Sequence, residues 1–202
     1  MRIFSILAAF IASTGSAIAH TGHGGHGNAS FAHGFMHPLG GLDHLLAMIA
    51  VGFLAYLVSE RIGTTRPLWL IPAAFLGAMA FGGALGASGV GLPLVELAIG
   101  LSIVAIGGAA AIGRAIPVAG AMALVGFFAL FHGHAHGTEM PADSSGLAYG
   151  LGFMAATAAL HAAGVGAGLG IARLFREQGV LAARAGGGAM ALAGLAIVAG
   201  VL

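Results

Sequence analysis

The sequence contains no cysteine and no lysine, and its charges are few. Its 202 residues include seven basic side chains, all of them arginine, and six carboxylates. Without cysteine the chain can form neither disulfides nor thiolate metal sites. Without lysine it has neither the phosphate-binding lysine of a Walker-type ATP site nor a Schiff-base nucleophile, so no ATPase function is implied. A net charge of +1 leaves no basic surface for nucleic acid.

Most of the sequence is apolar. Hydrophobic residues make up 59% of the chain and charged residues 6%, whereas roughly a quarter of an ordinary soluble domain is charged. This composition excludes a water-soluble globule. It predicts an all-α, polytopic membrane protein in contact with the lipid bilayer. The ten histidines are the side chains best able to bind metals or transfer protons.

The first 36 residues divide into two segments. Residues 1–19 contain Arg2, a short apolar stretch and a final Ala17-Ile18-Ala19, which is typical of a cleavable signal peptide. An uncleaved first helix is the alternative. Residues 20–36 are rich in Gly and His, show no periodicity and are expected to form a flexible periplasmic tail.

The tail is a candidate for metal capture. Its histidines are His20, His23, His26 and His33. Cleavage after Ala19 would add the α-amine of His20 as another nitrogen ligand. Tethered ligands near a pore raise the local metal concentration, although a disordered polar leader without a role would look the same.

Residues 37–202 form the predicted transmembrane domain. The hydropathy resolves into six runs near the length of about 20 residues that a bilayer crossing needs. They are 39–59, 67–87, 92–112, 115–133, 146–171 and 186–202. Glycines spaced four apart, such as Gly82 and Gly86 or Gly146 and Gly150, give faces that allow close helix packing, either within one chain or in a homo-oligomer.

Arginines after the signal lie only in alternate predicted loops. Two lie between the first and second spans, one between the third and fourth, and three between the fifth and sixth: Arg61, Arg66, Arg114, Arg173, Arg176 and Arg184. By the positive-inside rule these loops are cytoplasmic. We therefore expect a bacterial inner-membrane protein with both termini in the periplasm.

The first span begins with polar residues that lipid disfavours. In one continuous helix, His37, His44 and Met48 would share a stripe, because residues turn by about 100° each. Asp43 would either widen this polar face or orient an imidazole. Ionisable groups inside a span mark a function by default, although His37 would also suit a solvated helix end.

The fourth span ends in a second polar group. If the helix continues through Gly133 and Gly137, then His132, His136 and Glu139 share one face. This is metal-ligand spacing. His134 would point away from that face and is the expected bystander.

Two further groups complete the set. Glu96 lies one turn into the third span, and His161 lies deep in the fifth, where it is either a second station on a path inward or a packing histidine. The predicted metal site, in the outer half of the membrane, comprises His37, Asp43, His44, Glu96, His132, His136 and Glu139. Secondary candidates are Met48, His161, His20, His23 and His26.

Imidazole and carboxylate without thiolate suit borderline divalent ions. Ni²⁺, Zn²⁺, Co²⁺ and Cu²⁺ all fit this donor set, and the set alone does not select among them. No prosthetic group is implied. The ion is expected to be a substrate that passes through the protein.

Two motifs carry a family resemblance. HPLGGLDHLLAMIAVG (37–52) and FHGHAHGTE (131–139) resemble the HupE/UreJ family of bacterial nickel permeases, whose signatures read HPxxGxDHxxxMxxVG and FHGxAHGxE. The resemblance implies Ni²⁺ uptake for hydrogenase or urease maturation, through a six-span protein after a cleaved signal. It also implies that His37, Asp43, His44, His136 and Glu139 are functional, with His132 in the same motif and Glu96 as the acid of the third span.

Three functions are compatible with these residues. Uptake of a divalent metal, most simply nickel, by a permease or facilitator that is not an enzyme fits mixed His and carboxylate ligands on helix ends. The alternative is an intramembrane zinc-dependent hydrolase with Asp43 or Glu96 as general base. A metal sensor or metallochaperone partner is the third, although short cytoplasmic loops leave it little surface.

Overall fold

A computed structural model describes residues 26–113, 116–140 and 146–201, and all regular structure in these residues is helical. The predicted all-α class is therefore confirmed for this part of the chain. In chain order the elements are α2 (His26–Met36), η1 (His37–Leu39), α3 (Leu42–Ile62), α4 (Pro67–Ala87), α5 (Val95–Ile112), α6 (Val118–Thr138), α7 (Gly146–Phe175), η2 (Arg176–Gln178) and α8 (Gly179–Val198). Here η marks a short 3₁₀ helix.

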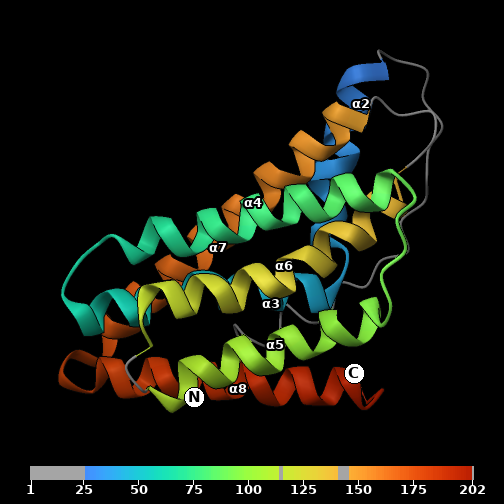
Figure 1. The fold of residues 1–202 in the computed structure, drawn as a ribbon. Coiled ribbons are helices and arrows are strands. Elements are labelled where there is room, and N and C mark those ends of the chain that lie inside the picture. Colours follow the sequence, from blue (N-terminus) through green and yellow to red (C-terminus); the bar gives the residue numbers. More distant parts are fainter. Residues whose placement is uncertain (1–25, 114–115, 141–145, 202) are drawn as a thin grey trace.

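The helices are long and apolar enough to cross a membrane. Five stretches of the described residues meet these requirements, and the last, Gly146–Val198, is 53 residues long and contains both α7 and α8. A crossing needs about 20 residues, and Figure 1 shows that the chain reverses direction between these two helices. One helix thus corresponds to each of the six predicted spans. Helix α6, which corresponds to the fourth predicted span, ends later than predicted, at Thr138. Helix α8, which corresponds to the sixth, begins earlier, at Gly179.

The predicted tail is not irregular throughout. From His26 to Met36 the chain forms α2, which packs along α7. The two backbones touch, because a Cβ on Gly34 would overlap the carbonyl oxygen of Tyr149 and one on Gly152 would overlap that of Phe31. This packing overrides the weak helix propensity of a glycine-rich segment. The predicted signal, 1–19, and the candidate ligands His20 and His23 lie outside the described residues.

The first span does not begin as one continuous helix. His37 lies in η1, and α3 starts only at Leu42, because Gly41 has an extended backbone with φ −105° and ψ 125°. The single-helix projection that placed His37 above His44 is therefore wrong in its geometry. The break turns His37 away from α3 and toward other elements of the bundle.

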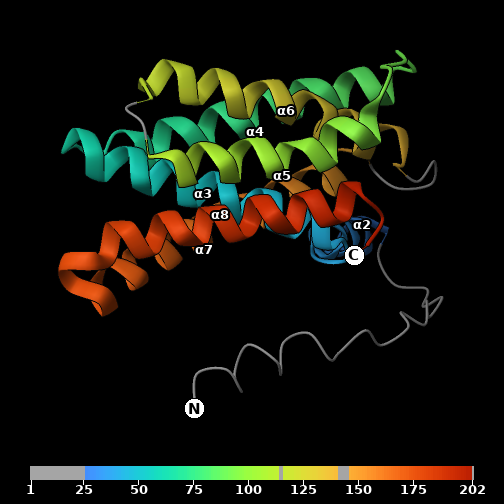
Figure 2. The same cartoon turned by 90° about the horizontal axis from the view of Figure 1, so that it is seen from below.

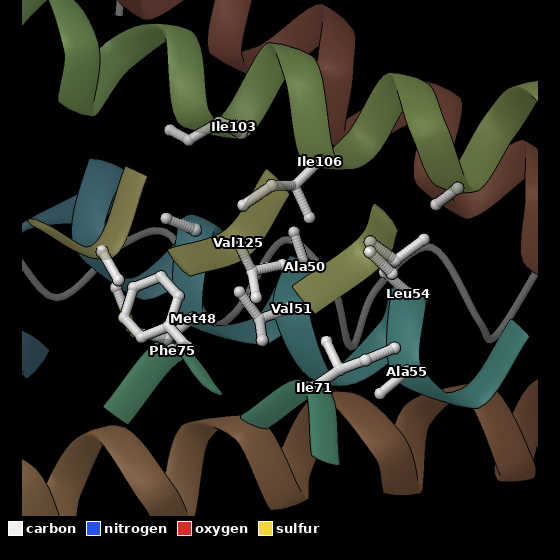
Figure 3. Close-up of a cluster of buried hydrophobic side chains, with 14 of the residues drawn as sticks. Met48, Ala50, Val51, Leu54, Ala55, Ile71, Phe75, Ile103, Ile106 and Val125 are labelled. Atoms are coloured by element: carbon white, nitrogen blue, oxygen red, sulfur yellow. The ribbon is translucent and has the colours of Figure 1, made fainter. Parts of the chain in front are cut away.

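Helix α3 lies at the centre of the bundle. It contacts α4, α5, α6, α7 and α8, with α4 and α6 on one side and α5 and α8 on another (Figures 1 and 2). The main apolar core forms around α3. Figure 3 shows members of this core, among them Met48 of α3, Phe75 of α4, Ile106 of α5 and Val125 of α6. This core lies beneath the polar residues at the start of α3.

Glycines bring α4 and α6 into direct backbone contact. A Cβ on Gly82 would overlap the carbonyl oxygen of Leu130, and a Cβ on Gly133 would overlap that of Met79. The predicted small-residue packing is confirmed at Gly82. It is not confirmed at Gly150, where an added Cβ would meet no atom within 4 Å. The close packing against α4 also explains why α6 remains helical to Thr138 although it contains Gly133 and Gly137.

Arginines bond backbone carbonyls at the end of the bundle opposite the start of α3. Arg61 Nη1 donates to the carbonyl of Gly113 at 2.9 Å, and Arg184 donates from Nε to Ala111 and from Nη2 to Ile112, both at 2.9 Å. These carbonyls end α5 and lack partners within the helix. Their partial negative charge also favours cations there. The arginines thus tie the ends of α3, α5 and α8 together, far from the histidine-rich end.

Candidate metal site

The predicted polar residues gather at one end of the bundle. His37 comes from η1, Asp43 and His44 from the first turn of α3, and His132 and His136 from the last turns of α6. Because α3 begins where α6 ends, side chains far apart in the sequence meet. Two connected groups result, and His136 belongs to both.

The outer group consists of His37, His136 and Glu139. Glu139 Oε2 lies 3.5 Å from Nε2 of His37 and 3.6 Å from Nδ1 of His136. One ligand atom from each residue can be chosen so that all three lie within 4.8 Å of one another. The ring centroids of the two histidines are 4.8 Å apart. Two nitrogens and one oxygen at this spacing suit a divalent metal ion.

Burial favours the neutral form of His37. The pKa of His37 is lowered from its ordinary value, chiefly because the ring is partly buried, and the carboxylate of Glu139 opposes this shift. A lowered pKa keeps the imidazole neutral near pH 7. Only the neutral form offers a lone pair to a metal ion.

The inner group is a line of three imidazoles. Nε2 of His44 lies 2.5 Å from Nε2 of His136 and 3.0 Å from Nδ1 of His132. The other nitrogen of His132, Nε2, lies 3.0 Å from the hydroxyl of Ser102 on α5. Which nitrogen carries each proton depends on the tautomer of each ring. Imidazole nitrogens from α3 and α6 thus converge around His44.

Asp43 supports His44 from the side. Its Oδ1 accepts the backbone N–H of His44 at 2.8 Å and lies 3.5 Å from Nδ1 of the same residue. A carboxylate beside Nδ1 favours a proton on that nitrogen and leaves Nε2 free as an acceptor or ligand. Of the two predicted roles for Asp43, the geometry fits the one that orients an imidazole.

Exposure is high at the outer end of the two groups and low at the inner end. The side chain of Glu139 is 55% exposed and that of His37 31%. His136 is 7% exposed and His132 is completely buried. The donors therefore lead from the surface into the bundle, with no separation above 3.6 Å along the way. Such an arrangement can draw a cation inward by exchange between neighbouring ligands.

Three predicted residues stand apart from this line. Glu96 is exposed and shares a cavity of about 290 Å³ with Asp43, at the ends of α5 and α8. Met48 is fully buried in the apolar core. His134, the expected bystander, points elsewhere and bonds the carbonyl of Val90 through Nε2 at 2.6 Å.

The remaining candidates lie elsewhere. His161 is buried in the middle of α7, and its ring packs against Phe75 with centroids 5.0 Å apart. His26 is the first residue of α2.

Sequence reasoning missed the supporting side chains. Ser102 bonds His132, and Phe153 packs on His136 with ring centroids 4.1 Å apart. Tyr149 lies 5.9 Å from His37 by the same measure. Tyr149 and Phe153 are one turn apart on α7, and this spacing was visible in the sequence. Ser102 gave no comparable signal, because a single serine in an apolar helix is common.

Comparisons with known proteins give a consistent result. Residues 8–197 match the model of the family described as HupE / UreJ protein. The curated Protein HupE of Rhizobium leguminosarum bv. viciae is 45% identical over 184 residues, which cover 91% of each chain. No solved structure matches.

Proposed function

The chain belongs to the HupE/UreJ family, and from that membership we propose that it is a membrane permease or facilitator for uptake of a divalent transition metal ion, most simply Ni²⁺. Its apolar helices support a membrane protein. The proposal places it in the bacterial inner membrane, with residues 1–19 as a cleaved signal and both termini in the periplasm.

One observation carries this proposal: the unbroken line of ligands from exposed Glu139 to buried His132. A catalytic metal site needs a fixed ion and one open position. A transport site needs several ligand groups of graded depth, so that an ion binds firmly enough to enter and weakly enough to leave. The contact of 2.5 Å between His44 and His136 joins the outer and inner groups into one such path.

Each residue has a distinct role in this proposal. Glu139 and His37 receive the ion, His136 passes it on, and His44 with His132 holds it within the bundle. Asp43 orients His44. Glu96 adds negative charge in the neighbouring cavity, which attracts cations without a direct bond. His20, His23 and His26 would raise the local concentration of metal before entry.

The identity of the ion rests on the family. The donor set also suits Co²⁺, Zn²⁺ and Cu²⁺, and nickel or cobalt is the choice that family membership favours. Nothing in the structure or in the comparisons supports the hydrolase alternative. The family match favours transport over it.

The decisive experiment measures metal entry into proteoliposomes that contain the purified full-length protein. We expect Ni²⁺ to enter faster than into protein-free vesicles, and Ni²⁺, Co²⁺, Zn²⁺ and Cu²⁺ supplied separately give the order of preference. Metal-dependent hydrolysis without flux would favour the hydrolase. Metal binding with neither flux nor hydrolysis would favour a sensor.

Two variants of α6 test the site within this assay. His136→Gln removes a ligand that both groups share, so we expect flux to fall more than the roughly 10- to 100-fold typical of losing a residue that only orients a ligand. His134→Gln is the matched control. It is also a buried histidine of α6, but its partner is a carbonyl, which glutamine can still bond. Equal losses in both variants would contradict the site assignment.

A further inference from the structure

A stripe of buried residues on α7 continues inward from the metal site. Its members recur every four positions: Tyr149, Phe153, Thr157 and His161. Residues at this spacing lie above one another on one helix face. The first two touch the histidines of the site, as described above. The last two lie beyond them, deeper in the bundle.

Thr157 and His161 carry polar atoms without partners. Thr157 is 0% exposed and His161 1%. Neither Oγ1 of Thr157 nor either ring nitrogen of His161 has a hydrogen-bond partner among the described residues. A buried unpaired polar group costs about 1–3 kcal/mol. In folded proteins, buried polar groups without a protein partner are usually satisfied by bound water or an ion.

The ring of Phe75 connects this pair to the inner imidazoles. Its centroid is 5.7 Å from that of His132 and 5.0 Å from that of His161. Phe75 belongs to the buried apolar core shown in Figure 3. The side chain of Phe75 has no polar atom that could hold an ion. Phe75 contacts both His132 of the candidate site and His161.

A partly open cavity lies beside His161. A cavity of about 370 Å³ between α4 and α7 is lined by His161 together with apolar side chains that include Leu68, Pro72 and Val165. Its volume would admit water, and His161 is the polar group in a lining that is otherwise mostly apolar. His161 follows Phe153 by eight residues, which is about 12 Å of helix, and it lies at the middle of the 30-residue α7.

We propose that His161 and Thr157 form a transit site for the partly hydrated divalent metal ion, on the inner side of Phe75. The inference rests on the proposed function and adds the next step of the path. The ion leaves His132, passes the ring of Phe75 and is held by the imidazole of His161, while Thr157 bonds its water. One imidazole and one hydroxyl bind a metal weakly, which suits release toward the cytoplasm.

The test compares flux with binding in the same protein. In His161→Leu, proteoliposome uptake of Ni²⁺ should fall by at least about tenfold, the scale on which residues around a metal site act. Equilibrium binding of Ni²⁺ at the outer site should stay within twofold of wild type. The fold should also persist, because replacing an unpaired buried polar group by an apolar one is nearly neutral.

A second pair of variants removes hydroxyls. Thr157→Val, which is nearly isosteric, should slow flux in the same direction by a smaller factor. Tyr56→Phe is its matched control, because the hydroxyl of Tyr56 on α3 is also buried and also lacks a partner among the described residues. We expect unchanged flux in that control.

Three outcomes would overturn the transit site. They are wild-type flux in His161→Leu, equal loss of flux and outer-site binding in that variant, and equal slowing in Thr157→Val and Tyr56→Phe. The second would show that His161 supports the outer site or the fold instead. A wild-type protein that binds Ni²⁺ but carries none across would overturn the permease proposal itself, and the transit site with it.

Discussion

At the scale of single residues, partners decide what each polar group does. His134 and His136 are two positions apart on α6 and similarly buried. His134 bonds the carbonyl of Val90, which leads into α5, whereas His136 joins Glu139 to His44. The first anchors a loop, and the second is a proposed metal ligand. Residue type alone does not separate these roles.

Asp43 provides the first residue-scale prediction. Asp43→Asn should lower Ni²⁺ flux by about 10- to 100-fold, the cost typical of losing a group that orients a metal ligand. Asparagine keeps the ability to accept a backbone N–H at a helix start, so α3 should still form. It loses the charge that favours a proton on Nδ1 of His44. Flux into proteoliposomes, at matched protein levels, measures the effect.

The control for Asp43 is an acid far from the site. Glu177→Gln removes an exposed carboxylate in η2, at the arginine-rich end of the bundle. We expect no change of flux in this variant. Wild-type flux in Asp43→Asn, or an equal loss in both variants, would show that Asp43 does not act through His44.

Part of the site was predictable at this scale. The shared face of His136 and Glu139 followed from their i,i+3 spacing on one helix. The contact between Asp43 and His44 followed from adjacency. The position of His37 did not, because Gly41 breaks the helix that the projection assumed. The pairing of His132 with His44 joins residues 88 positions apart, and only the packing of α3 against α6 reveals it.

At the scale of elements, glycine sets the spacing of α4 and α6. Both Gly82 and Gly77 are on α4, but they differ in what surrounds them. A Cβ on Gly82 would overlap the carbonyl oxygen of Leu130, whereas a Cβ on Gly77 would meet no atom within 4 Å. Since α6 carries His132 and His136, a shift of this helix would move the ligands.

We therefore predict opposite effects of two alanine substitutions. Gly82→Ala should destabilise the protein by about 1–3 kcal/mol, as overpacking does, and weaken Ni²⁺ binding because α6 is pushed away. Gly77→Ala should be neutral or stabilising by less than about 1 kcal/mol, since alanine favours the helix more than glycine does. Thermal unfolding in detergent and equilibrium Ni²⁺ binding measure the two effects. A lower melting temperature in Gly77→Ala than in Gly82→Ala would contradict the packing argument.

The sequence predicted the helices better than their ends. Long apolar runs indicated six spans, and each corresponds to a helix. The apolar run that predicts α6 ends at 133, and Gly133 and Gly137 weaken a helix locally, yet packing on α4 keeps the chain helical to Thr138. Helix α2 was missed for a related reason. Its stability comes from contact with α7. No local pattern in a Gly/His segment predicts such a contact.

At the scale of the whole molecule, charge is sorted to two ends. Within the described residues, ion-pair contacts join carboxylates to histidines and not to arginines. Arg61 and Arg184 instead bond carbonyls at the end of α5, opposite the metal site. Acids without a permanent countercharge are costly near the membrane. A bound divalent cation neutralises them, which fits a site that fills and empties.

The same sorting predicts the orientation of the protein in the membrane. By the positive-inside rule the arginine-rich end faces the cytoplasm and the metal site faces the periplasm. Because the chain has no cysteine, one introduced cysteine is the only thiol. Ser88 follows α4 at the histidine-rich end, whereas Thr65 and Gln178 lie at the opposite end, and all three are exposed. In intact cells, a membrane-impermeant maleimide should label Ser88→Cys but not Thr65→Cys or Gln178→Cys. After the inner membrane is permeabilised, all three should react, which controls for accessibility.

Labelling of Thr65→Cys or Gln178→Cys in intact cells, with Ser88→Cys protected, would show that the protein has the opposite orientation. The donor line from Glu139 to His132 would then open to the cytoplasm and serve export of the ion instead of its uptake.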